Sequence, residues 1–248
     1  MNYTISETYD LPSRGKVYSQ AVNPVIKLRS MTTSHEIMRL SHSDRPMKVM
    51  SDIIDDCMVE KCGISAYDMC VADYQFLLHK LRVVTYGTEY RVTAPCTLCG
   101  TNNTKILNLD EIECVPFRDE CRQYLSFELP RSRDMISLNI ITPRMMDTIQ
   151  IKTKEMKKQR QGFNGDLEWL NTLICYIDTV NGEKKMDYAM EEYVKALPLA
   201  DSNYINNMAN QFVKSFGLNN EVEFECDFCG LSYKSPFRLT NEFYRPGL

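Results

Sequence analysis

Apolar residues between positions 33 and 87 recur at the spacing of an amphipathic helix. The pattern predicts a first helix from about residue 33, a second from Pro46 to Gly63, and a third over about residues 66–86. Proline is favoured in the first turn of a helix, and glycine commonly follows the last turn. Three amphipathic helices in succession predict a small helical unit over residues 33–87.

The residues before this unit mix turn formers with short β-like runs. Leu11-Pro12-Ser13-Arg14-Gly15 has the composition of a turn, and residues 25–28 alternate as a strand does. We therefore expect residues 1–32 to form an N-terminal arm that adds less to the core than the helices do. The strand could extend the sheet of a partner or pack against the protein's own sheet, and both alternatives stay open at this point.

Alternating apolar and polar residues predict two β-hairpins that are far apart in the sequence. The first covers about residues 89–109, and the second covers about residues 221–237. The stretch between them is expected to mix strands and helices, at about residues 124–129, 135–141, 143–162, 190–197 and 199–216. Separate helical and hairpin segments of this kind predict an α+β fold.

Four of the ten cysteines stand in two copies of one motif, Pro95-Cys96-Thr97-Leu98-Cys99-Gly100 and Glu225-Cys226-Asp227-Phe228-Cys229-Gly230. Each copy is Cys-x-x-Cys-Gly between strand-like residues, a pattern typical of a zinc knuckle, in which a hairpin turn points two thiolates the same way. The glycine allows the backbone conformation that is needed behind the second cysteine. Two knuckles complete a tetrahedral site, so the sequence predicts one structural zinc ion bound by Cys96, Cys99, Cys226 and Cys229.

The alternatives to a shared zinc site are two redox-active or idle cysteine pairs, or two separate and incomplete metal sites. A thioredoxin-type pair belongs near a βαβ pattern and needs no second copy. The long separation of the motifs is no obstacle, because closing such a loop costs about 4 kcal/mol whereas a structural zinc ion supplies roughly 10–16 kcal/mol. We therefore expect a zinc-ribbon-like β platform, built from residues 88–110 and 221–248, with residues 111–220 as a mixed α/β insertion between its halves.

Composition and charge narrow the classes of function. The chain of 248 residues has 29 basic and 33 acidic side chains, which disfavours a protein whose main task is to hold a phosphate backbone. The basic run Lys152–Arg160 is interpreted as the solvated end of a helix.

Uncharged apolar stretches such as residues 173–177 are far shorter than the roughly 20 residues of a membrane span, and a signal peptide is not apparent. We therefore expect a cytoplasmic protein that does not bind membranes and keeps its cysteines reduced.

The sequence does not predict an enzyme. Histidine is scarce, with only His35, His42 and His79. The chain has no Walker loop, no glycine-rich dinucleotide turn, no Gly-x-Ser-x-Gly elbow and no His-Glu-x-x-His motif. We therefore expect no catalytic residues and a function that depends on binding.

The order of several motifs resembles the T4-like phage baseplate protein family. The resemblance rests on Leu11-Pro12-Ser13-Arg14-Gly15-Lys16-Val17-Tyr18, then Thr85-Tyr86-Gly87-Thr88-Glu89-Tyr90, then the first Cys-x-x-Cys-Gly motif. It covers about residues 9–110 and extends to the second cysteine motif, whereas residues 111–220 are matched by position only. Within the family, the members that assemble the baseplate hub are the nearest fit.

The resemblance implies a non-enzymatic protein that promotes assembly of the central hub of a phage tail baseplate. Its implied partners are baseplate hub proteins, its implied location is the host cytoplasm or the tail baseplate of the virion, and self-association is possible. A structural hub subunit is one alternative, and a zinc-ribbon nucleic-acid-binding module that uses the Lys152–Arg160 run is another. A thiol oxidoreductase that uses one of the Cys-x-x-Cys pairs is the third.

Overall fold

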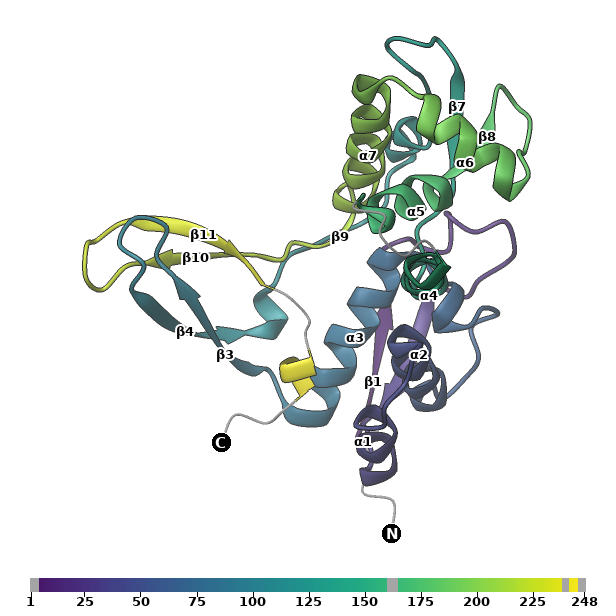
Figure 1. The fold of residues 1–248 in the computed structure, drawn as a ribbon. Coiled ribbons are helices and arrows are strands. Elements are labelled where there is room, and N and C mark those ends of the chain that lie inside the picture. The colour runs from purple at the N-terminus through teal and green to yellow at the C-terminus, as the bar shows by residue number, and fades with distance from the viewer. Residues whose placement is uncertain (1–4, 160–164, 238–240, 245–248) are drawn as a thin grey trace.

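The chain has a mixed α+β architecture with several small antiparallel sheets, as the sequence predicts (Figure 1). A computed structural model describes residues 5–159, 165–237 and 241–244. Its helices are α1 (Thr33–Arg39), α2 (Pro46–Cys57), α3 (Val71–Tyr86), α4 (Pro143–Gln159), α5 (Leu167–Tyr176), α6 (Asp187–Ala196) and α7 (Leu199–Lys214), with short 3-10 turns η1 (Ala66–Asp68), η2 (Leu109–Glu111), η3 (Asp119–Tyr124) and η4 (Asn241–Tyr244). Its strands are β1 (Ser6–Asp10), β2 (Val25–Arg29), β3 (Glu89–Pro95), β4 (Asn102–Asn108), β5 (Cys114–Val115), β6 (Ser126–Glu128), β7 (Met135–Leu138), β8 (Ile177–Val180), β9 (Gly217–Leu218), β10 (Glu221–Glu225) and β11 (Ser232–Pro236).

The N-terminal residues form a hairpin that belongs to the core. Strands β1 and β2 pair antiparallel, and the side chains of Leu11, Ile26 and Leu28 are almost completely buried against α2 and α3. The segment therefore contributes to the core, although with fewer buried apolar side chains than α3, in line with the expectation that it adds less than the helices. Strand β2 pairs with β1, and its buried residues alternate toward the helices, so this strand packs on the protein's own sheet.

A buried carboxylate holds the turn of this hairpin against α3. Asp73 lies in the first turn of α3 and is fully buried. It accepts hydrogen bonds from the backbone N–H and the hydroxyl of Ser13 and from the hydroxyl of Tyr18. The phenol oxygen of Tyr18 in turn accepts the backbone N–H of Cys70 at 3.1 Å. Burial raises the pKa of the Asp73 carboxyl, although the hydrogen bonds from Ser13 and Tyr18 oppose that rise.

The helices differ at their ends from the sequence-based bounds. Helix α2 starts at Pro46 as predicted but ends at Cys57 instead of Gly63, because Met58 adopts an extended conformation and bridges to Leu28 of β2. Helix α3 starts at Val71, after the separate turn η1. The predicted end of α4 near Gly162 lies outside the described residues.

The insertion between the two hairpins has its own apolar core. Strands β6, β7 and β8 form a three-stranded sheet in that order, and α4, α5, α6 and α7 pack around it (Figure 1). The two ends of the insertion meet in the short antiparallel pair β5–β9. Gly217 of β9 has φ 101°, and a Cβ placed there would lie 3.0 Å from the Cβ of Ala72, so glycine allows β9 to approach α3 closely.

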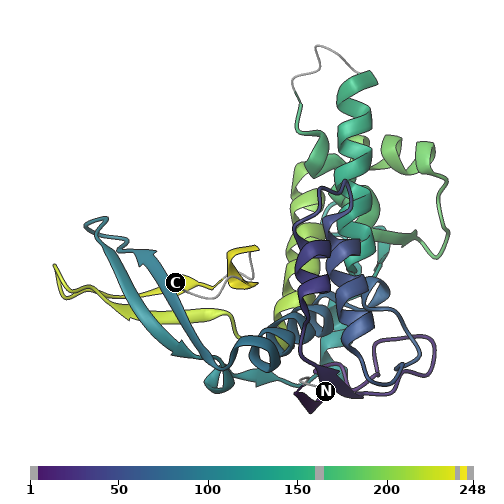
Figure 2. The same ribbon diagram turned by 90° about the horizontal axis from the view of Figure 1, so that it is seen from below.

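Two hairpins, β3–β4 and β10–β11, lie side by side and project away from the helices; we call them together the double hairpin (Figures 1 and 2). Its base is fixed to α3 by Arg82, whose guanidinium donates to the backbone carbonyls of Phe243, Gly87 and Glu89. The hydroxyl of Tyr244 donates to the carbonyl of Leu78 at 2.7 Å. The cysteine motifs lie at the opposite end, in the turns of the two hairpins.

Candidate metal centre

Each cysteine pair lies in the turn of its own hairpin, and the two turns have the same backbone geometry. The N–H of Cys96 donates to the carbonyl of Thr101 at 2.8 Å, and the N–H of Gly100 donates to the carbonyl of Cys96 at 3.0 Å. The second turn repeats both hydrogen bonds, at 2.9 and 2.8 Å. Gly100 and Gly230 have φ of 74° and 70°, in the left-handed region that favours glycine. The repeated sequence therefore folds in the same way twice.

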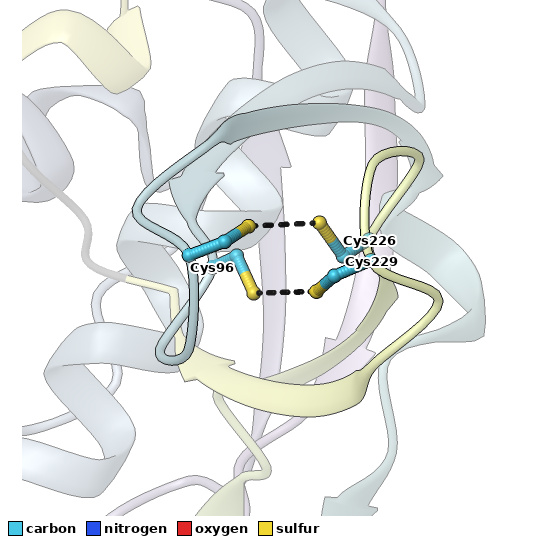
Figure 3. A group of neighbouring side chains, drawn as sticks. Cys96, Cys226 and Cys229 are labelled. Carbon is cyan, nitrogen blue, oxygen red and sulfur yellow. Dashed lines mark hydrogen bonds between the residues drawn. The ribbon is translucent and has the colours of Figure 1, made fainter.

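The two turns face each other and bring four sulfur atoms together (Figure 3). The Sγ of Cys96 lies 3.7 Å from that of Cys229, the Sγ of Cys99 lies 3.5 Å from that of Cys226, and all four lie within 4.8 Å of one another. A tetrahedral zinc ion with Zn–S distances of about 2.3 Å places its sulfurs about 3.8 Å apart. The four cysteines thus lie close together at separations that fit a metal ion, and all four are free thiols.

The thiols of this cluster differ in how readily they lose a proton. The backbone N–H of Cys229 lowers the pKa of the Cys226 thiol to about 6, and the side chain of Thr101 lowers the pKa of Cys99. The pKa of Cys229 is raised to about 12: a backbone hydrogen bond at Leu231 lowers it, but desolvation and the neighbouring thiols outweigh that effect. Four sulfurs at this distance do not all ionise without a compensating charge, and a divalent cation supplies one.

Comparison with known protein families identifies the family of the chain. The family model described as T4 bacteriophage base plate protein matches residues 2–243. The chain belongs to this family. Searches of curated proteins and of solved structures found no match. The family match includes residues 111–220, which the sequence motifs matched by position only, so the match extends over both the insertion and the double hairpin.

Two buried polar side chains join the hairpins of this base plate protein behind the cysteines. Asn103 of β4 donates to the hydroxyl of Tyr233 of β11 at 3.0 Å and accepts the backbone N–H of Asp227 at 3.0 Å. The hydroxyl of Tyr233 donates to the carbonyl of Ala94 on β3, also at 3.0 Å. The two hairpins therefore meet through specific hydrogen bonds as well as through the sulfur cluster.

Sequence reasoning missed both of these side chains. Asn103 follows Cys99 by the same number of residues as Tyr233 follows Cys229, so the two occupy equivalent positions in the repeated motif. Comparing the two copies beyond the glycine would have revealed this signal. The two side chains lie on inward-facing strand positions, where a polar group needs a partner.

The other cysteines and the histidines lie outside the double hairpin. Cys57 and Cys70 are buried in the core, and Cys175 is partly exposed. His35 bonds to Thr32 and, at 2.7 Å, to Asp56. Within the described residues, the four cysteines of the double hairpin are the one group of three or more histidine, cysteine or carboxylate side chains that are placed to share a metal ion.

Among the same residues, none of the helices combines the length and the apolar character that a membrane span requires.

Proposed function

We propose that the protein promotes assembly of the central hub of a phage tail baseplate through protein–protein binding and catalyses no reaction. The observation that carries this proposal is the family match over nearly the whole chain, from residue 2 to residue 243. Hub proteins of the same baseplate are its partners, and assembly takes place in the host cytoplasm. The projecting double hairpin supports a binding role because it is a separate, exposed element on a rigid base.

We further propose that the cysteine cluster holds one structural zinc ion in a zinc-ribbon-like platform. Cys96, Cys99, Cys226 and Cys229 would be its ligands, and four protein thiolates leave no open position for a substrate. The ion would join two segments that are distant in sequence, and it would neutralise much of the charge of the thiolates. Its part in hub assembly is to hold the double hairpin in one shape.

Binding of nucleic acid has less support than binding of protein. In the described part of the basic run on α4, Lys152 pairs with Asp187 at 3.2 Å and Lys154 pairs with Asp44 at 3.0 Å. Arg160, the last residue of that run, lies outside the described residues. Lysines that face carboxylates offer little net charge to a phosphate backbone, and the chain as a whole is acidic.

A deletion-and-rescue experiment tests the proposed function. Deleting the gene from the phage that encodes this chain should stop hub formation, and supplying the protein from a plasmid should restore it. Normal hubs and normal infectivity without the protein would contradict the proposal. Quantitative immunoblotting of purified mature tails then separates two roles: absence of the protein indicates an assembly factor, and a fixed number of copies per tail indicates a structural hub subunit.

A further inference from the structure

The end of the double hairpin that carries the cysteines exposes two large apolar side chains. We define the tip as residues 95–101 and 225–231. Leu98 is 72% exposed and Phe228 is 79% exposed, although the neighbouring strand residues Phe224 and Tyr233 are buried. Leu98 and Phe228 occupy the same position in the two copies of the motif, immediately before the second cysteine. The repeat therefore presents an apolar side chain twice, once from each hairpin.

The backbone under these side chains is already fixed. The N–H of Leu98 donates to the Sγ of Cys96 at 3.4 Å. Each turn is also closed by the two backbone hydrogen bonds described above. A rigid platform loses little conformational entropy when it binds, so the two side chains are suited to act as anchors at an interface.

The charged side chains in and next to the tip are acidic, which favours a partner with a basic surface. Residues 94–104 contain no charged side chain, and residues 225–233 contain only Glu225 and Asp227. Thiolates around a divalent cation add further negative charge. The nearest lysines in the hairpins lie farther along the strands, where Lys105 donates to the carbonyl of Glu223 and Lys234 faces the carboxylate of Glu223 at 3.5 Å. A phosphate backbone or an anionic lipid surface would be repelled.

We propose that the tip is the docking surface of the protein, and that Leu98 and Phe228 enter an apolar pocket rimmed by lysine or arginine on a baseplate hub subunit. This inference rests on the proposed function, because the hub supplies the partner. The apolar anchors provide affinity, and the acidic side chains match the basic rim of the pocket. The rest of the double hairpin sets the distance between the tip and the helices.

Binding measurements on purified proteins test the proposal. The probes are the individually purified hub subunits of the same phage, titrated with wild-type protein and with the double variant Leu98→Ser/Phe228→Ser. We expect the variant to keep its metal content and melting temperature, and to bind the hub subunit at least about 30-fold more weakly, as expected for anchor residues. The matched control is Met186→Ser/Tyr188→Ser, which removes side chains that are 81% and 78% exposed near α6 and should leave affinity within about twofold.

A charge reversal tests whether the acidic side chains of the tip face a basic rim on the hub subunit. Asp227→Lys should weaken binding of the hub subunit at low salt, and the effect should shrink as salt is added. Unchanged affinity of the Leu98→Ser/Phe228→Ser variant would overturn the docking surface and leave the proposed function intact. Wild-type protein that binds none of the hub subunits would contradict the proposed function itself. Tip-dependent self-association, or tip-dependent retention of DNA or lipid vesicles, would replace the hub pocket with a different partner and overturn the proposal.

Discussion

His79 is a buried histidine whose environment opposes its charged form. It is fully buried in α3, its ring stacks on Phe243 at 6.2 Å between centroids, and neither ring nitrogen has a hydrogen-bond partner among the described residues. Burial lowers its pKa to about 4, helped by the charge of Lys80. In the unfolded chain the pKa is about 6.5, so between those values the unfolded chain binds more protons than the folded one.

The sign of this difference gives a prediction about pH. The contribution of a neutral His79 to stability is complete above about pH 6.5 and is lost as pH falls toward 4, a loss of roughly 3 kcal/mol. His79→Leu should therefore flatten the fall in the free energy of unfolding between these pH values, as measured by urea titration. His42→Gln is the matched control, since His42 is exposed. Identical pH profiles for His79→Leu and wild type would show that the ring is not held in its neutral form.

The cysteines of the cluster should differ sharply from the other cysteines when they are replaced. Cys226→Ser would remove one of the four proposed ligands, and would then forfeit much of the roughly 10–16 kcal/mol that a structural zinc ion supplies. We expect it to destabilise the double hairpin markedly, whereas Cys114→Ser, at a partly buried strand position without such neighbours, should cost about 1 kcal/mol or less. Thermal unfolding of the two variants checks this, and equal effects would argue against a metal at the cluster.

The N-terminal hairpin gives two neighbouring residues with opposite exposure. Ile26 is 1% exposed and Val25 is 47% exposed on the same strand. Ile26→Asp buries an unpaired carboxylate and should cost several kcal/mol, enough to unfold much of the protein at 37 °C, whereas Val25→Asp should cost about 1 kcal/mol or less. Urea unfolding measures both. A stable Ile26→Asp variant that has lost only its hub-assembly activity would instead mean that this hairpin is a binding arm.

Residue types close together in the sequence predicted most of the helices and strands. They could not predict contacts between residues that are far apart in the sequence. The cysteine turns and the start of α2 at Pro46 follow from residue types within a few positions of one another. By contrast, the backbone N–H groups of Met47 and Lys48 at the start of α2 are bound by Asp147 of α4, far away in the sequence. Such pairings decide where helices end and which polar residues are buried, so the place of the N-terminal hairpin could not be read from its composition.

We expect the proposed zinc ion to stabilise only the double hairpin, because the ends of the insertion are also held together by a contact that does not involve the cysteines. The insertion has its own core, and its two ends meet in the β5–β9 pair, independently of the cysteines. Treatment of the protein with a chelator should therefore increase the amide exchange of the double hairpin and leave the sheet of the insertion protected. Amide hydrogen exchange checks this: protection should fall in residues 89–108 and 221–236 and persist in β7 and β8. Uniform loss of protection would mean that the whole chain depends on the metal.

The two cysteine motifs lie on either side of the entire insertion in the sequence. One zinc ion bound to both motifs would therefore link two distant segments of the chain. The proposed role of the double hairpin depends on one zinc ion bound by these four cysteines. The most direct test is elemental analysis of protein purified without chelator, compared with the Cys226→Ser/Cys229→Ser variant. We expect about one zinc ion per chain in the wild type and none in the variant. Metal-free wild-type protein, or full zinc occupancy in the variant, would contradict this expectation.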